Sequence, residues 1–132
     1  MGLALTKILI VEDDYQTRNR MSLLLTDAGY KVVEGKNGEE GIEKARENPD
    51  INLVISDFHM GDIDGLEMCQ AIRNMRNFSN IPMFMVSTEL SKTSKIRGHQ
   101  VGILTWIAKP YEAENVLNIV SKALSREAQS VG

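Results

Sequence analysis

The chain has 132 residues, 42% of them hydrophobic, a formal net charge of −3 and a single cysteine. This length is typical of one domain, and one cysteine excludes an internal disulfide bond. An acidic chain with scattered lysines lacks the basic surface that binds nucleic-acid phosphates, and no apolar run reaches the ~18 residues that span a bilayer. We therefore expect a cytoplasmic protein that binds neither nucleic acids nor membranes.

The chain begins with a strand followed by a helix. The apolar run at 7–11 predicts a buried strand, and three acids follow it directly: Glu12, Asp13 and Asp14. Apolar residues then recur at helical spacing and stop at Gly29, a residue that suits the left-handed position past a helix end.

The same alternation is predicted a second time. Residues 30–34 predict a short strand. Asn37 is expected to open the next helix, Glu40 stands three residues later as in a capping box, and Pro49 ends the helix.

The third strand ends on an acid. The apolar run at 53–57 predicts a strand covered on both faces, so Asp57 is expected to emerge at its carboxyl end. Taken alone, Asp57 is explained at least as well as the cap of the next helix. The acids after the first strand favour a shared site instead.

The second half continues the alternation. Further helices are expected at about 66–75, at 91–101 and from Ala113 onward, and further strands at 81–87 and 106–108. Cys69 is expected to pack in the core. The helix at 91–101 has Ile96 as nearly its only apolar anchor, and we expect it to be marginal. Five strands alternating with five helices predict an α/β fold, a doubly wound parallel sheet with helices on both faces.

Polar residues collect at the carboxyl ends of these strands, where open α/β sheets form ligand sites. They are Asp13, Asp14, Asp57, Ser87 and Lys109. Two carboxylates about 4 Å apart repel by roughly 4 kcal/mol at an effective dielectric constant of 20, so the acids need protons or a cation. Oxygen ligands with some access to water suit Mg²⁺.

These residues, in this order, resemble a receiver domain of a two-component response regulator, of the single-domain chemotaxis type. The resemblance extends from about Leu5 to Ala128 and includes the segment from Trp106 to Pro110. It implies a flavodoxin-like sheet with strand order 2-1-3-4-5. It also implies one receiver domain over 1–132 with no output domain, acting as a monomer.

The resemblance implies a chemistry for each site residue. Asp57 would accept a phosphoryl group from a histidine kinase, and Mg²⁺ would be held by Asp13, Asp14, Asp57 and the backbone carbonyl of His59. Lys109 and Ser87 would neutralise charge on the phosphoryl oxygens. Such a protein is a switch and not an enzyme, beyond catalysing its own phosphorylation and slow dephosphorylation.

The resemblance also implies an output. Ser87 and Trp106 would carry the switch to a face formed by the fourth helix, the fifth strand and the last helix, which would bind a partner such as a flagellar motor switch protein. His59, Thr88 and Glu89 would tune the rates. Thr88 is bulkier than the family's usual small residue and is expected to narrow access to the phosphoacceptor.

The sequence leaves alternatives open. Gly61 stands where the family usually has proline, which removes a backbone constraint after the phosphoacceptor. His59 is also explained as a solvated loop residue. A phosphorelay intermediate and a degenerate receiver acting as a scaffold are the nearest alternative functions, and an Asp-nucleophile phosphatase or a flavin carrier could share the fold.

Overall fold

The computed structural model describes the backbone of residues 5–131 and the side chains of residues 5–125, so the ends of the predicted domain over 1–132 lie outside it. Strands and helices alternate along the chain. The strands are β1 (Lys7–Val11), β2 (Lys31–Gly35), β3 (Leu53–Asp57), β4 (Met83–Ser87) and β5 (Thr105–Ala108). The helices are α1 (Tyr15–Asp27), α2 (Gly38–Glu47), α3 (Gly65–Arg73), α4 (Lys92–Val101) and α5 (Ala113–Val131).

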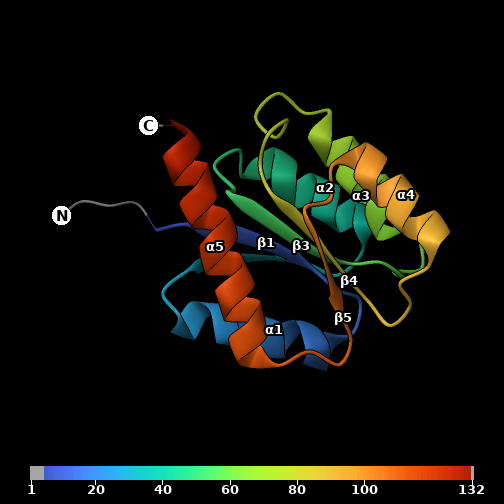
Figure 1. Cartoon of the computed structure of the whole chain (residues 1–132), viewed down its shortest axis with the longest axis horizontal. Coiled ribbons are helices and arrows are strands. Elements are labelled where there is room, and N and C mark those ends of the chain that lie inside the picture. The colour runs from blue at the N-terminus through green and yellow to red at the C-terminus, as the bar shows by residue number, and fades with distance from the viewer. Residues whose placement is uncertain (1–4, 132) are drawn as a thin grey trace.

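The strands form one parallel sheet in the order β2-β1-β3-β4-β5. Helices α1 and α5 cover one face, and α2, α3 and α4 cover the other (Figure 1). Every residue of β1, β3 and β4 is buried, as expected for strands covered on both sides. The predicted fold class and strand order are confirmed.

Each face of the sheet has its own apolar core, because successive side chains of a strand point to opposite faces. Ile8 and Ile10 of β1 pack in the core beneath α1 and α5. Leu9 and Val11 pack in the other core, with residues of α2 and α3. Cys69 is fully buried in this second core, as predicted.

Short polar side chains begin the helices. Asn37 caps α2 by accepting a hydrogen bond from the N–H of Glu40, as predicted. The expected capping box is wrong in its second half, because the Glu40 carboxylate accepts from the N–H of Lys36. The reciprocal pair lies instead at the start of α3, between Asp64 and Glu67.

The prediction that Ile96 anchors α4 is wrong. Its side chain is 61% exposed, and the buried residue of this helix is Gly98. A Cβ atom at Gly98 would lie 2.7 Å from Cζ2 of Trp106, so the missing side chain lets the helix backbone approach the indole. At the far end of α4, the guanidinium of Arg73 donates to the carbonyls of Val101 and Gly102.

The element boundaries differ from expectation by about a turn at most. β4 begins at Met83 and not at residue 81, and α3 ends at Arg73. Pro82, which has no N–H to donate, precedes β4. Within residues 5–131, no helix is long and apolar enough to cross a membrane.

Candidate functional site

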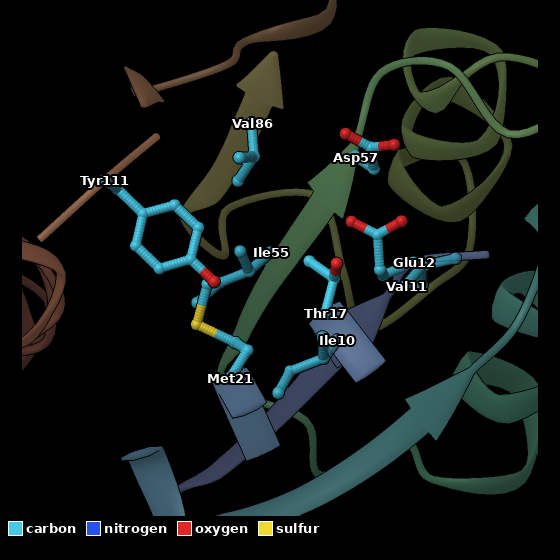
Figure 2. A pocket seen from close by; sticks show the side chains of 9 residues that line it. All are labelled: Ile10, Val11, Glu12, Thr17, Met21, Ile55, Asp57, Val86 and Tyr111. Atoms are coloured by element: carbon cyan, nitrogen blue, oxygen red, sulfur yellow. The ribbon is translucent and has the colours of Figure 1, made fainter. Parts of the chain in front are cut away.

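Three strands bring charged residues together at the carboxyl edge of the sheet. Asp57 ends β3 and is 8% exposed, and Glu12 follows β1 and is 6% exposed. Lys109 follows β5. Its Nζ lies 2.9 Å from Oδ1 of Asp57 and 3.1 Å from Oε1 of Glu12. The carboxylates of Glu12 and Asp57 lie above neighbouring strand ends in Figure 2. One ammonium therefore bridges two buried acids.

Burial sets the charge balance of this group. Burial raises the pKa of Glu12, and the nearby charge of Asp57 raises it further. The N–H of Asp14 lowers this pKa by donating a hydrogen bond to the Glu12 carboxylate, but the net pKa is raised. Burial alone would lower the pKa of Lys109, but hydrogen bonds to Asp57 and Glu12 outweigh it and the net pKa is raised. Lys109 is therefore an ammonium at neutral pH.

The acids that could hold a metal ion are Glu12, Asp13 and Asp57. One carboxylate oxygen from each lies within 4.8 Å of the other two. Asp13 is exposed, whereas the other two are buried, so the cluster opens to solvent on one side. Oxygen ligands with room for water suit Mg²⁺, which keeps several waters when bound to proteins. The residues present fit this ion.

The structure places Asp14, which was predicted to be a metal ligand, at the start of α1 and outside this cluster. Its carboxylate caps α1, accepting from the backbone N–H of Thr17 at 2.9 Å and from the Thr17 hydroxyl at 2.5 Å. These bonds lower the pKa of Asp14. Glu12 takes its place in the cluster. The spacing from Asp14 to Thr17 is that of a helix cap, a signal that was present in the sequence.

Ser87 does not bond to Asp57 in this structure. Its hydroxyl is buried, donates to the carbonyl of Glu89 at 2.8 Å and accepts from the N–H of Glu89 at 3.0 Å. Asp57 and Ser87 nevertheless lie at the same end of two neighbouring strands, because Asp57 is in register with Val86, the residue before Ser87. The backbone of Glu89 thus holds the hydroxyl in a turn beside the site.

Thr88 and His59, the other predicted tuning positions, are both exposed. Thr88 lies in a surface groove of about 460 Å³ between α1 and the start of α5, which Lys109 and Tyr111 also line. The His59 ring lies 4.7 Å from that of Phe58, between ring centroids. A metal-binding role for the His59 carbonyl stays a prediction.

Trp106 lies between the site and α4. Its ring meets Phe58, the residue after Asp57, edge to face, with centroids 5.9 Å apart and planes at 82°. The indole also lies against Gly98, since a Cβ atom there would be 2.7 Å from Cζ2 of Trp106. The indole is partly buried against the core. It therefore touches both the loop that follows the phosphoacceptor candidate and the fourth helix.

Tyr111 is a site residue that the sequence reasoning missed. Its ring lines a small cavity of about 10 Å³ behind Asp57 and Glu12, together with Thr17 and Met21 (Figure 2). Burial raises the pKa of the Tyr111 hydroxyl. The ring closes the site on the side of α1 and α5.

Asp62, in the loop that follows Asp57, is a second residue that the sequence analysis did not single out. Its carboxylate accepts from the N–H groups of Gly38 and Glu39, at 3.1 and 3.0 Å. The bond from Glu39 lowers the pKa of Asp62 most, as expected for an acid at a helix N-terminus. This contact fastens the loop after Asp57 to the start of α2.

We expect Gly61→Pro to destabilise the protein. Gly61 has φ +88°, which proline cannot adopt. The free energy of unfolding should fall by more than about 1 kcal/mol, because the loop must leave its conformation. Urea unfolding measures this, with Gly61→Ala as a control that keeps the N–H. A more stable Gly61→Pro would contradict the loop geometry.

The comparisons with known proteins agree with this geometry. A model of the response regulator receiver domain family matches residues 8–121. Chemotaxis protein CheY1 of Helicobacter pylori is 32% identical over 106 residues, 80% of this chain and 86% of that protein. The structure of Vibrio cholerae chemotaxis protein CheY4 has a TM-score of 0.87 and 32% identity, and the match covers 91% of this chain and 99% of that one.

The chain spans half or less of two other curated relatives. One is Sensor histidine kinase CheAY of Helicobacter pylori, which is 27% identical over 91% of this chain, while the match covers 15% of that protein. The match to the family model over residues 8–121 and the 32% identity with CheY1 identify the family of this chain. It belongs to the response regulator receiver domain family, the signalling switches of two-component systems, which bind Mg²⁺ in an acidic pocket.

Proposed function

We propose that this chain is a chemotaxis-type receiver that is phosphorylated on Asp57. The observation that carries the proposal is the ion pair of 2.9 Å between Asp57 and Lys109, beside the acids Glu12 and Asp13. This arrangement supplies a nucleophile, a fixed cation and a metal site in one place. A receiver that acts only as a scaffold does not need the groups for phosphoryl transfer, whereas Asp57, Lys109 and the acids of the metal cluster are all present in this chain.

In the proposed reaction, a carboxylate oxygen of Asp57 attacks the phosphorus of a phosphohistidine. The P–N bond breaks, its electron pair stays on the ring nitrogen, and the ring, which is already protonated on its other nitrogen, leaves as neutral imidazole. Mg²⁺, when bound, supplies positive charge to the phosphoryl oxygens. Glu12, Asp13 and Asp57 would hold it. Lys109 pairs with a phosphoryl oxygen in place of the Asp57 oxygen that reacts, and burial of the site strengthens that interaction.

The proposed donor is a histidine kinase, a partner class that the similarity to CheAY supports, and the proposed target is a protein such as a flagellar motor switch component. We further propose that the chain acts in the cytoplasm as a monomer.

We expect a small phosphoryl donor such as acetyl phosphate to label the protein only when Mg²⁺ is present. Intact-mass spectrometry should show one added phosphoryl group that is lost in alkali, as for an acyl phosphate. The Asp57→Asn variant should gain none, and Asp50→Asn, an acid at the far end of the sheet, should be labelled like the wild type. Labelling that persists without Mg²⁺ would sink the metal assignment.

Phosphorylation is proposed to switch the protein through Ser87. The phosphoryl group adds charge and acceptor oxygens that need donors, and the Ser87 hydroxyl can leave its turn with Glu89 to provide one. Movement of residues 88–90 would open space near Trp106. The response would then reach α4 and β5 through the contact between Trp106 and Gly98.

We expect Ser87→Ala to be phosphorylated but uncoupled from this response. Amide exchange over residues 88–106 should change when wild-type protein binds beryllofluoride, a stable phosphoryl mimic, and should change little in Ser87→Ala. Ser79→Ala, which removes the hydroxyl of an exposed serine in the loop between α3 and β4, is the matched control. Equal responses in wild type and Ser87→Ala would show that this hydroxyl is not the coupling donor.

A further inference from the structure

Arg18 reaches from α1 to the backbone of the acid cluster. Its Nη1 donates to the carbonyl oxygen of Glu12 at 2.7 Å, and only 14% of the side chain is exposed. We propose that Arg18 is a positioning residue that holds the metal-binding acids in place. This inference rests on the proposed phosphoryl-transfer function and extends it to a residue outside the cluster.

The guanidinium is itself held on other sides. Its Nε lies 3.2 Å from Oε1 of Glu34, at the end of β2, and the second oxygen of Glu34 accepts from the hydroxyl of Ser22. The ring of Tyr15 lies 5.6 Å from the guanidinium carbon. A planar fork that is fixed in this way is pre-organised to bond one carbonyl.

The carbonyl that Arg18 binds belongs to the peptide that joins Glu12 to Asp13. On the other side of the same residue, the N–H of Glu12 donates to the carbonyl of Gly35 at 3.1 Å. These two bonds fix the direction in which the chain leaves β1. Asp13 is exposed, so its aim toward Asp57 depends on its backbone more than on packing.

Removal of the Arg18 guanidinium changes both the charge near the acids and the position of their backbone, and these two changes have opposite effects on the affinity for Mg²⁺. Loss of a positive charge near three acids would, by itself, strengthen the binding of a cation. Loss of the bond to the Glu12 carbonyl frees the peptide to rotate and scatters the ligands, which weakens binding. Partners that orient metal ligands typically change metal affinity by about 10-fold or more. The direction of the change therefore decides between the two effects.

The experiment measures the affinity of the full chain for Mg²⁺ by its competition with Mn²⁺, followed through water-proton relaxation. The variants are Arg18→Met, which keeps much of the length, and Arg18→Lys, which keeps the charge. The control is Arg46→Met, which removes an exposed arginine that is paired with Glu43 on α2. Urea unfolding of each variant shows that it is folded under the conditions of the titration.

We expect Arg18→Met to weaken Mg²⁺ binding by about 10-fold and Arg18→Lys by a smaller factor, because a lysine cannot bond Glu12 and Glu34 with the same fork. Arg46→Met should bind like the wild type. Unchanged or tighter binding in Arg18→Met overturns the inference, and if that variant does not fold, unchanged binding in Arg18→Lys does so. Failure of the wild type to bind Mg²⁺ would overturn the proposed function as well.

Discussion

Lys109→Met is expected to destabilise the protein at neutral pH and nearly abolish its phosphorylation. The substitution removes the ammonium that lies 2.9 Å from Asp57 and 3.1 Å from Glu12, and leaves two buried carboxylates side by side. Loss of one partner from a buried charge pair typically lowers the free energy of unfolding by about 3 kcal/mol. Labelling by acetyl phosphate should slow about 100-fold, as when an enzyme loses a donor to a developing negative charge.

The pH dependence of this loss has a defined sign. Lys109 lowers the pKa of Glu12 by hydrogen bonding to its carboxylate, so without Lys109 burial raises this pKa further in the folded protein, and folding favours the protonated form. The variant is then closest to the wild type at low pH, and its deficit grows as the pH rises through the raised pKa of Glu12. Urea unfolding without Mg²⁺ from acid to neutral pH measures this, with Lys36→Met as the control at an exposed lysine. A deficit that shrinks as the pH rises would contradict the bridging role of Lys109.

Gly65→Ala is expected to have the second large effect, on stability and on the site together. Gly65 begins α3, and its N–H donates to the carbonyl of Phe58 at 2.8 Å. A Cβ atom there would collide with the backbone carbonyl oxygen of Asp57 and lie 2.6 Å from Sδ of Met85. The sulfur belongs to a flexible side chain and can move, but the carbonyl cannot move without shifting the end of β3.

Overpacking of this kind lowers the free energy of unfolding by about 1–3 kcal/mol, which exceeds the small gain in helix propensity from alanine. Because the shifted carbonyl belongs to the proposed nucleophile, labelling should also slow. The control is Gly61→Ala, which is strained by its φ but has no atom within 4 Å of the added Cβ. A Gly65→Ala protein as stable as the wild type would show that the close approach is not rigid.

The sequence predicted the fold well because its signals agree with one another. The runs at 53–57 and 81–87, which were predicted as strands, contain the strands Leu53–Asp57 and Met83–Ser87, and every residue of these strands is buried. The run of α5 from Ala113 keeps its helical spacing, and Val116 and Val120 are fully buried. These periodic patterns predict element type and the face that is buried, and the parallel sheet follows from their alternation.

Sequence reasoning was less successful where a side chain can serve two purposes. Three consecutive acids follow β1, and the type of residue does not show which of them points into the site. The start of α1 decides it, because Asp14 becomes the helix cap and leaves Glu12 and Asp13 for the cluster. Ser87 lies at the expected strand end, but the direction of its hydroxyl depends on the turn through Glu89, which has no sequence pattern.

The attachment of α4 was mispredicted for a similar reason. Its only large apolar residue, Ile96, suggested an anchor, yet that residue lies on the exposed face. The packing of α4 depends on the residue that it faces on β5. The indole of Trp106 is large, so the helix can approach it only where the helix has no side chain, at Gly98. Likewise, the sequence shows a glycine at 61 but not its positive φ.

Asp57 is the proposed phosphoacceptor, and chemical mapping of the modified residue tests this assignment. Borohydride reduces an aspartyl phosphate to homoserine, so protein treated with acetyl phosphate and Mg²⁺, then reduced and digested, reveals the position by peptide sequencing. We predict homoserine at position 57 in the wild type and none there when Mg²⁺ is omitted. Homoserine at Asp13 or Asp14, with aspartate intact at position 57, would contradict the claim.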